Sequence, residues 1–495
     1  MLAQSVMLPC ASSMVDARAV PALPGCPELV MGLGVLTREI TAGLVDEVIE
    51  QAGCREKRRR LLPARTMVYF VLGMCLFSGA DSAGPPGYRS VMRWLTNGRR
   101  HLDDLVLPTS SALTRARQRL GSRPLELLFS RRRGPLAAAG TPGAFAFGLR
   151  LAAWDGTGLD AADTPANAAA SGVTQGGNPQ LRLLSLIECG THAVIDAVFD
   201  GVGGASEQKL ARRLLRGLGP GMLLLADRNF PGYELWGMAA RTGADLLWRI
   251  KKNQVFVILR VLPDGSFLSV MPTPAENIRH GQARAAGRVL PRPPEGHLIR
   301  VVEYSITVTR AGCDARVEPF RLVTTVLDHE RAPAARLAEA YHQRWEIENG
   351  FAELKTRLRG AAFILRSRSP ELVRQELFAF LTVCQSLCSL RAEAAQASGI
   401  DPDRISPTVA VRIARDHAGS QTAVTLHSVA QARRRAIRDV LGDLLPARRD
   451  RQCERVKKPP KNTFPSKKRD QPRSSGKVTY KIKINRKVLS PAETP

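Results

Sequence analysis

The sequence contains no Cys-x-x-Cys pair, although it has nine cysteines, which are scattered from Cys10 to Cys453. An odd number of cysteines without a spacing pattern predicts free thiols in a reducing cytosol, and it argues against a disulfide scaffold or a zinc ribbon.

Long apolar runs are also absent. The longest nearly uncharged run, Thr66 to Ala80, is shorter than the ~20 residues that span a bilayer, so it predicts a buried helix. The first residues lack a basic start and include Asp16, so we expect no signal peptide.

Acidic residues are scarce relative to basic ones. The 495 residues include 72 Lys and Arg but only 45 Asp and Glu, which gives a net charge of +27. A basic excess of this size favours a polyanionic partner, nucleic acid before any membrane. Lysine is rare outside the last 40 residues: of 14 lysines, only five precede Arg455, and they are Lys57, Lys209, Lys251, Lys252 and Lys355. A lysine in the body of the chain is therefore a candidate for a specific role.

Composition and periodicity divide the chain into five parts. We expect a flexible segment (1–35), a helical domain (36–135), a strand-rich domain (145–390), a C-terminal helical region (391–445) and a basic tail (446–495). A helix at 111–120 carries Arg115, Arg117 and Arg119. It is either a solvated basic face or a helix that contacts DNA.

The predicted sheet carries two aspartates at the ends of apolar strands. Strands are expected at 145–154, 181–187, 192–199, 222–226 and 245–250, with helices from 206 and at 231–240. This order predicts a mixed sheet flanked by helices. Asp155 and Asp227 directly follow the first and fourth strands, so their side chains should converge at the carboxyl edge of the sheet.

A helix expected over 334–358 carries polar residues beside its apolar stripe. At about 100° per residue, four of them fall within an arc of roughly 60°. They are Tyr341, Arg344, Glu348 and Lys355. Taken alone, the helix could simply be solvated, with an Arg344–Glu348 ion pair one turn apart. The scarcity of lysine and the two upstream aspartates favour a site instead.

These residues match a known signature. The spacing Y-x2-R-x3-E-x6-K resembles that of the DDE transposases of bacterial insertion sequences, specifically the insertion-element-four group, and the likeness runs from about 36 to about 390. The resemblance implies an RNase H-like core with a β-rich insertion at 251–327, preceded by a helical DNA-binding domain. It also implies that Asp155, Asp227 and Glu348 form the catalytic triad.

The implied reaction is metal-dependent DNA strand cleavage at the ends of the element, followed by strand transfer, as in cut-and-paste transposition. Two Mg²⁺ ions, replaceable by Mn²⁺, would be held by the three carboxylates. Tyr341, Arg344 and Lys355 would contact the DNA. Expected partners are double-stranded transposon ends, target DNA and a second copy in a homodimeric synaptic complex, in the bacterial cytoplasm at the nucleoid and without a membrane.

Two other functions share much of this sequence evidence. One is a catalytically inactive, transposase-derived DNA-binding regulator, which the intact acidic residues and the complete signature argue against. The other is a structure-selective nuclease on the same core, which would not need a basic helical domain ahead of it.

The tail has its own composition. Residues 446–495 contain 16 basic and four acidic residues, a net charge of +12, and repeated prolines, which predicts a disordered segment. It could add nonspecific DNA affinity or be an extension without a role. Within it, residues 477–488 alternate enough to pair as an edge strand if a partner were offered.

Overall fold

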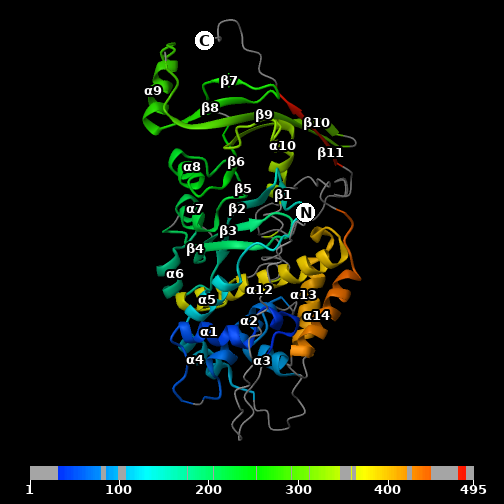
Figure 1. Ribbon diagram of the computed structural model, residues 1–495. Helices are drawn as coiled ribbons and strands as arrows, with labels where there is room; N and C mark the ends of the chain where they lie inside the picture. The colour runs from blue at the N-terminus through cyan, green and yellow to red at the C-terminus, as the bar shows by residue number, and fades with distance from the viewer. Residues whose placement is uncertain are drawn as a thin grey trace, which may run out of the picture.

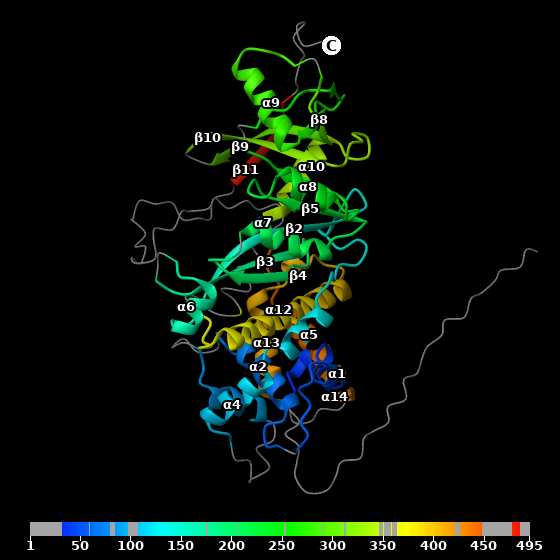
Figure 2. The same ribbon diagram turned by 90° about the vertical axis from the view of Figure 1, so that its left-hand side faces the viewer.

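One mixed sheet runs through the middle of the computed structural model, and helices gather on its faces and at one end (Figures 1 and 2). The structure describes residues 32–58, 60–79, 85–97, 107–174, 177–204, 206–251, 254–290, 292–310, 313–345, 350, 358, 364–420, 426–447 and 478–485. Among these residues the strand order is β4-β3-β2-β5-β6-β10-β9-β8-β7, with β1 paired to β2 and β11 paired to β9.

The first five strands in this order form the part of the sheet that carries Asp155 and Asp227. They are β4 (Val194–Gly201), β3 (Gln180–Glu188), β2 (Leu149–Asp160), β5 (Met222–Ala226) and β6 (Asp245–Arg249), and the short β1 (Phe145–Ala146) pairs with β2. β3 is antiparallel to β2 and β4, whereas β5 and β6 are parallel to β2. The apolar run of β5 is buried on both faces, as parallel strands require. This topology confirms the predicted RNase H-like mixed sheet.

Helices cover both faces of this core. α7 (Glu207–Leu214) and α8 (Tyr233–Ala240) pack on the face that carries Trp154 and Leu224. α10 (Ala334–His342) packs on the opposite face, against a cluster that includes Ala153 and Leu225. The face that a residue occupies therefore decides which helix it meets.

The insertion continues the same sheet. β10 (Cys313–Thr324) pairs with β6, and β9 (Gly296–Arg310), β8 (Phe267–Pro272) and β7 (Arg260–Val261) follow in order. The sequence did not predict helix α9 (Pro274–Ala285), whose first turn is capped by Thr273 and begins with proline. Within the insertion expected to be β-rich, residues 254–259 run beside β8 without a regular ladder, whereas 260–261 form β7.

The remaining helices form one body below the sheet (Figure 1). They are η1 (Gly34–Arg38), α1 (Ala42–Gln51), α2 (Ala64–Leu76), α3 (Tyr88–Thr96), α4 (Ser110–Leu120), α5 (Arg123–Arg132), α12 (Pro370–Ser398), η6 (Pro402–Arg404), α13 (Pro407–Gly419) and α14 (Leu426–Leu441). Short elements at the sheet edge are α6 (Pro165–Ser171) and η3 (Leu215–Gly217).

Helix α12 joins the N-terminal and C-terminal helices into that body. It packs against α2, α5, α13 and α14 and shares one apolar core with them. The domain boundary expected at 390/391 falls inside α12 and is therefore wrong. Among the described residues α12 is the one helix long and apolar enough to cross a membrane, but 83% of its most apolar window is buried inside the protein. The apolar run from Thr66 forms the buried helix α2, as predicted.

The basic helix α4 does not present all of its arginines to solvent. Arg117 is fully buried and donates to Gln375 Oε1 at 2.9 Å and to Ser367 Oγ at 3.0 Å. Arg119 donates to the Leu62 carbonyl at 2.7 Å. The expectation that Arg115, Arg117 and Arg119 share a DNA-contacting face is therefore wrong for Arg117, which links α4 to α12.

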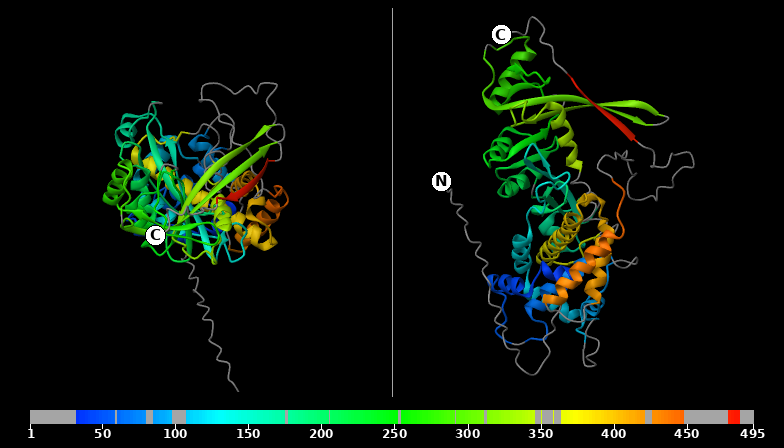
Figure 3. Two further views of the ribbon diagram at one scale, coloured as in Figure 1. Left: turned by 90° about the horizontal axis from the view of Figure 1, so that it is seen from above. Right: turned by 45° about the vertical axis from the view of Figure 1, so that its right-hand side comes forward.

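Part of the tail belongs to the fold. Residues Val478–Ile484 form strand β11, antiparallel to residues 304–310 of β9 (red in Figures 1 and 3). The half-buried Ile482 and Ile484 pack against the core beside α10. The predicted disorder of residues 446–495 is wrong for this strand, because the far half of β9 supplies the partner edge that its alternation needs.

Candidate active site

Asp155 and Asp227 lie side by side on neighbouring parallel strands: Asp155 is inside β2, which continues to Asp160, and Asp227 directly follows β5. β2 and β5 pair in register from Arg150↔Met222 to Ala153↔Leu225, a constant offset of 72. The same offset places Asp155 opposite Asp227. Each carboxylate accepts a hydrogen bond from the next backbone N–H: from Gly156 at 2.8 Å and from Arg228 at 2.7 Å. These local bonds fix both side chains where the β2–β5 ladder stops. The strand expected to end at 154 is longer than predicted, because β2 stays paired with β3 as far as Asp160.

The strand alternation directs both aspartates toward the face that α10 covers. Ala153 and Leu225 lie two residues before Asp155 and Asp227, and both pack in the core beneath α10. Because side chains alternate along a strand, the aspartates follow them onto that face. Both are half-buried. The residues that precede them, Trp154 and Ala226, are fully buried on the other face.

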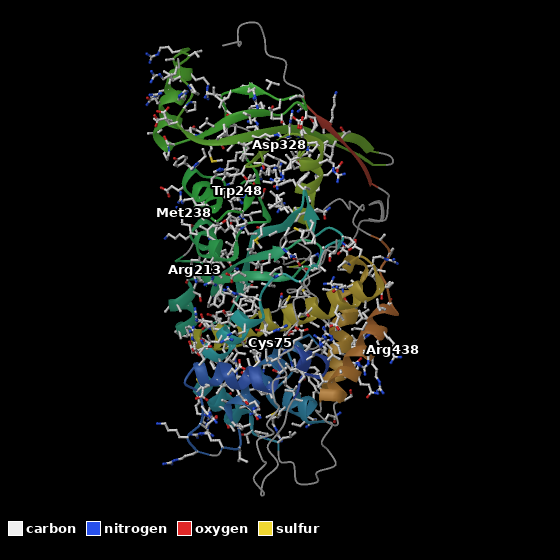
Figure 4. The ribbon with its side chains drawn as sticks, in the orientation of Figure 1. Cys75, Arg213, Met238, Trp248, Asp328 and Arg438 are labelled. Atoms are coloured by element: carbon white, nitrogen blue, oxygen red, sulfur yellow. The ribbon has the colours of Figure 1, made fainter. Side chains whose placement is uncertain are left out.

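The end of the neighbouring strand β6 adds a cation, Arg249. β5 pairs with β6 through Ala226↔Trp248, so the next register position sets Arg249 beside Asp227. The guanidinium of Arg249 lies over the Phe320 ring, 4.0 Å from its centroid. Figure 4 labels Trp248, the buried neighbour of Arg249 on β6.

Tyr341 connects α10 to this strand edge. Its side chain is 2% exposed and its hydroxyl donates to the carbonyl of Ala226 at 3.2 Å, one residue before Asp227. Burial raises the pKa of this hydroxyl, although the charge of Arg344 acts the other way. In this conformation Tyr341 supports the end of β5. Its predicted contact with DNA stays a prediction.

Arg344 and His342 lie just beyond Tyr341. Arg344 is 6% exposed and its guanidinium is 5.9 Å from the centre of the Tyr341 ring. Burial, together with the charges of Arg344 and Arg249, lowers the pKa of His342 to about 4. His342 is therefore neutral at neutral pH, and the positive charge of this region comes from the two arginines.

The helix that carries the signature is shorter than predicted. α10 ends at His342 and a 3-10 turn, η4 (Gln343–Trp345), follows it. A 3-10 turn has three residues per turn instead of 3.6, so the face predicted for one continuous helix over 334–358 does not extend past His342. Glu348 and Lys355 lie outside the described residues.

A third carboxylate approaches the two aspartates from the opposite face of the sheet. Glu207 is the first residue of α7, and a Cβ placed on Gly156 would lie 2.7 Å from its Oε1. Burial raises the pKa of Glu207; Arg182 lowers it, and the charges of Asp155 and Asp227 raise it. The sequence analysis missed this residue. The glycine directly after Asp155 was the available signal.

The donors at this edge fit a hard divalent cation. Asp155 and Asp227 offer half-buried carboxylate oxygens on adjacent strands, the ligand type that Mg²⁺ and Mn²⁺ prefer. Within the described part of the chain no three Asp, Glu, His or Cys side chains are grouped closely enough to hold a metal ion.

Comparison with known proteins decides the family. Residues 30–130 match the insertion element 4 transposase N-terminal family and residues 146–384 match the transposase DDE domain. The chain is 30% identical over 351 residues to transposase InsG for insertion sequence element IS4 of Escherichia coli strain K12, over 68% of this chain and 72% of that protein. This chain belongs to the IS4 group of DDE transposases.

Membership confirms the resemblance on which the sequence analysis relied. The IS4-group transposase is an enzyme that acts on DNA, and DDE transposases use divalent metal ions. Among solved structures, this chain is similar to the piggyBac transposase synaptic complex with hairpin DNA. The TM-score is 0.43, and the identity is 11% over 84% of this chain and 85% of that chain.

Proposed function

We propose that this transposase cleaves the DNA strand at the ends of its element and joins the freed end to target DNA at the edge formed by Asp155 and Asp227. The observation that carries the proposal is their register. The two carboxylates occupy matching positions of the adjacent parallel strands β2 and β5, on the face covered by α10, which bears Tyr341. Asp155, Asp227 and Glu348 are the proposed catalytic triad and metal ligands.

The described residues on either side of Glu348 support its place in the triad. Before it, Tyr341 is bonded to Ala226 at the end of β5. After it, Gly350 comes so close to the sheet that an added Cβ would lie 3.1 Å from Ile187 Cδ1. Ile187 is the register partner of Ala153, two residues before Asp155. Tyr341 and Gly350, which flank Glu348 in the sequence, therefore both contact the strands of the sheet near the two aspartates.

The proposed metal is Mg²⁺, as two ions for which Mn²⁺ can substitute. When bound, the ions activate the attacking oxygen and stabilise the leaving oxygen of an in-line displacement at phosphorus. The protein's part is to hold the three carboxylates in fixed positions. The backbone N–H groups of Gly156 and Arg228 hold the carboxylates of Asp155 and Asp227. Tyr341 of α10 is bonded to the Ala226 carbonyl, one residue before Asp227.

Cations on the same face are the proposed contacts to the DNA backbone. Arg344 and Arg249 border Tyr341 and supply positive charge next to the aspartates. Lys355 would extend this charge; it precedes Leu358, whose carbonyl is fixed by Ser78 Oγ and Arg415 at 3.1 Å each. Phosphate contacts of this kind position DNA without reading its sequence.

The proposed assembly is a homodimer that brings two double-stranded element ends together with the target DNA. Its proposed location is the bacterial cytoplasm, at the nucleoid. The net charge of +27 suits a protein held near DNA.

Substitution of the triad tests this function. Asp155→Asn and Glu348→Gln should each remove strand cleavage in Mg²⁺ or Mn²⁺ while binding to element-end DNA persists, because each change removes a metal-holding charge at nearly constant shape. Glu346→Gln is the control, two residues away, and should cleave like the wild type. Cleavage retained by either test variant would refute the assignment.

A further inference from the structure

Gly156 is glycine for a reason other than its backbone. Among the described residues the glycines with a positive φ do not include Gly156, so any residue could adopt its conformation. The space beside Gly156 is taken by Glu207: an added Cβ would lie 2.7 Å from its Oε1, 3.1 Å from its Cδ and 3.2 Å from its Cγ, so the carboxylate would have to move. The missing side chain at position 156 makes room for the carboxylate of Glu207 next to Asp155.

A helix-capping role does not account for this placement. The N-terminus of α7 already has a cap, because Ser206 accepts a hydrogen bond from the Lys209 N–H. An acidic residue in the first turn interacts favourably with the helix dipole, but a solvent-exposed side chain can make the same interaction. Glu207 is instead half-buried near two other carboxylates, and although Arg182 attracts its charge, burial and the two aspartates together keep its pKa raised.

We propose that Glu207 is a positioning residue of the metal site, which holds water in the shell of the cation bound by Asp155. This inference rests on the proposed function of Asp155 and Asp227. A water-mediated role fits the described residues, because Glu207, Asp155 and Asp227 are not close enough to form a three-ligand group. Gly156 leaves room for this carboxylate on the α7 face, one residue after Asp155, while Asp155 and Asp227 face α10.

The test is Mn²⁺ binding to the full chain, measured by the loss of the free-ion electron paramagnetic resonance signal. Glu207→Gln keeps the size of the side chain and removes its charge. It should weaken Mn²⁺ affinity about tenfold or more, as for other residues that support metal ligands through hydrogen bonds. Glu207→Asp keeps the charge and should lose less. Glu234→Gln is the matched control: Glu234 lies on α8, is exposed and pairs with Arg212 at 2.8 Å.

Thermal unfolding separates this role from a structural one. Without metal, Glu207→Gln should melt at or above the wild-type temperature, because burial and the charges of Asp155 and Asp227 outweigh the attraction of Arg182 for the ionised Glu207. With Mn²⁺ it should gain less stability than the wild type. Wild-type Mn²⁺ affinity in Glu207→Gln overturns the inference, and so does a lower melting temperature without metal or a failure to fold. If Asp155→Asn also binds Mn²⁺ normally, the proposed function fails with it.

Discussion

Arginine has different roles in the helical body and at the candidate active site of this transposase. In the helical body, buried arginines are saturated by the protein itself: Arg117 bonds Gln375 and Ser367, and Arg433 pairs with Glu39 and Glu393. At the edge of the sheet, Arg249 and Arg344 lie over aromatic rings beside two aspartates. The comparison shows that the basic charge of this chain is partly structural, so an arginine-rich helix does not identify a DNA contact unless its burial is known.

The largest expected effect on stability comes from breaking the buried arginine network. Arg117→Met leaves Gln375 and Ser367 without their partner inside the core, so we expect a loss of about 1–3 kcal/mol in the free energy of unfolding for each group left unsatisfied. Denaturant unfolding measures it. Arg115→Met, on the exposed face of the same helix, should change stability by less than about 0.5 kcal/mol. Equal effects of the two variants would contradict the structural role of Arg117.

The charged edge of the sheet should make stability depend on pH. His342 has a pKa of about 4 in the folded protein, below its ordinary value of 6.5. Between these values the unfolded chain binds more protons than the folded chain, so stability is fully present above pH 6.5 and falls as the pH drops toward 4. The total is at most roughly 3 kcal/mol. His342→Gln should flatten this slope in melts recorded from pH 4 to 7; an unchanged slope would assign it to other groups.

Cations at the sheet edge should affect DNA binding more than folding. Lys355→Ala and Arg249→Ala should each reduce the slope of log affinity against log salt by roughly 0.9, the value for one lost phosphate contact. Binding to element-end DNA across a salt series measures this. Arg213→Ala is the control, because Arg213 is exposed on α7 and pairs with Asp200 at 3.1 Å (Figure 4). A salt slope in both variants equal to that of the wild type would make these cations ordinary surface charges.

The smallest effect is expected for the tail. Removal of residues 446–495 should lower nonspecific DNA affinity, most clearly at low salt, and leave cleavage at saturating protein nearly unchanged. A deletion of 486–495 alone keeps β11 and should therefore aggregate less than the longer deletion, which exposes the edge of β9. Light scattering of the two truncated proteins compares them. Loss of catalysis at saturation would place the tail in the active site.

The sequence by itself predicted the features that depend on local pattern. Apolar runs located the core strands, since β5 is buried along almost its whole length. Asp227 directly follows β5, as predicted, whereas β2 continues past Asp155 to Asp160; the two aspartates are neighbours because their strands pair in parallel. The spacing from Tyr341 to Lys355 identified the family, which the comparisons confirmed. The assignment of Glu348 and Lys355 to the site stays a prediction.

Only the tertiary structure decided which residues meet across long stretches of chain. Arg117 is 258 residues from Gln375, so no local pattern could show that it is buried and not on a DNA-binding face. The same holds for β11, whose partner strand lies far upstream, and for Glu207, which reaches Gly156 from a separate helix. The physical reason is that burial, pairing and charge proximity are properties of contacts, and contacts between distant residues exist only after the chain has folded.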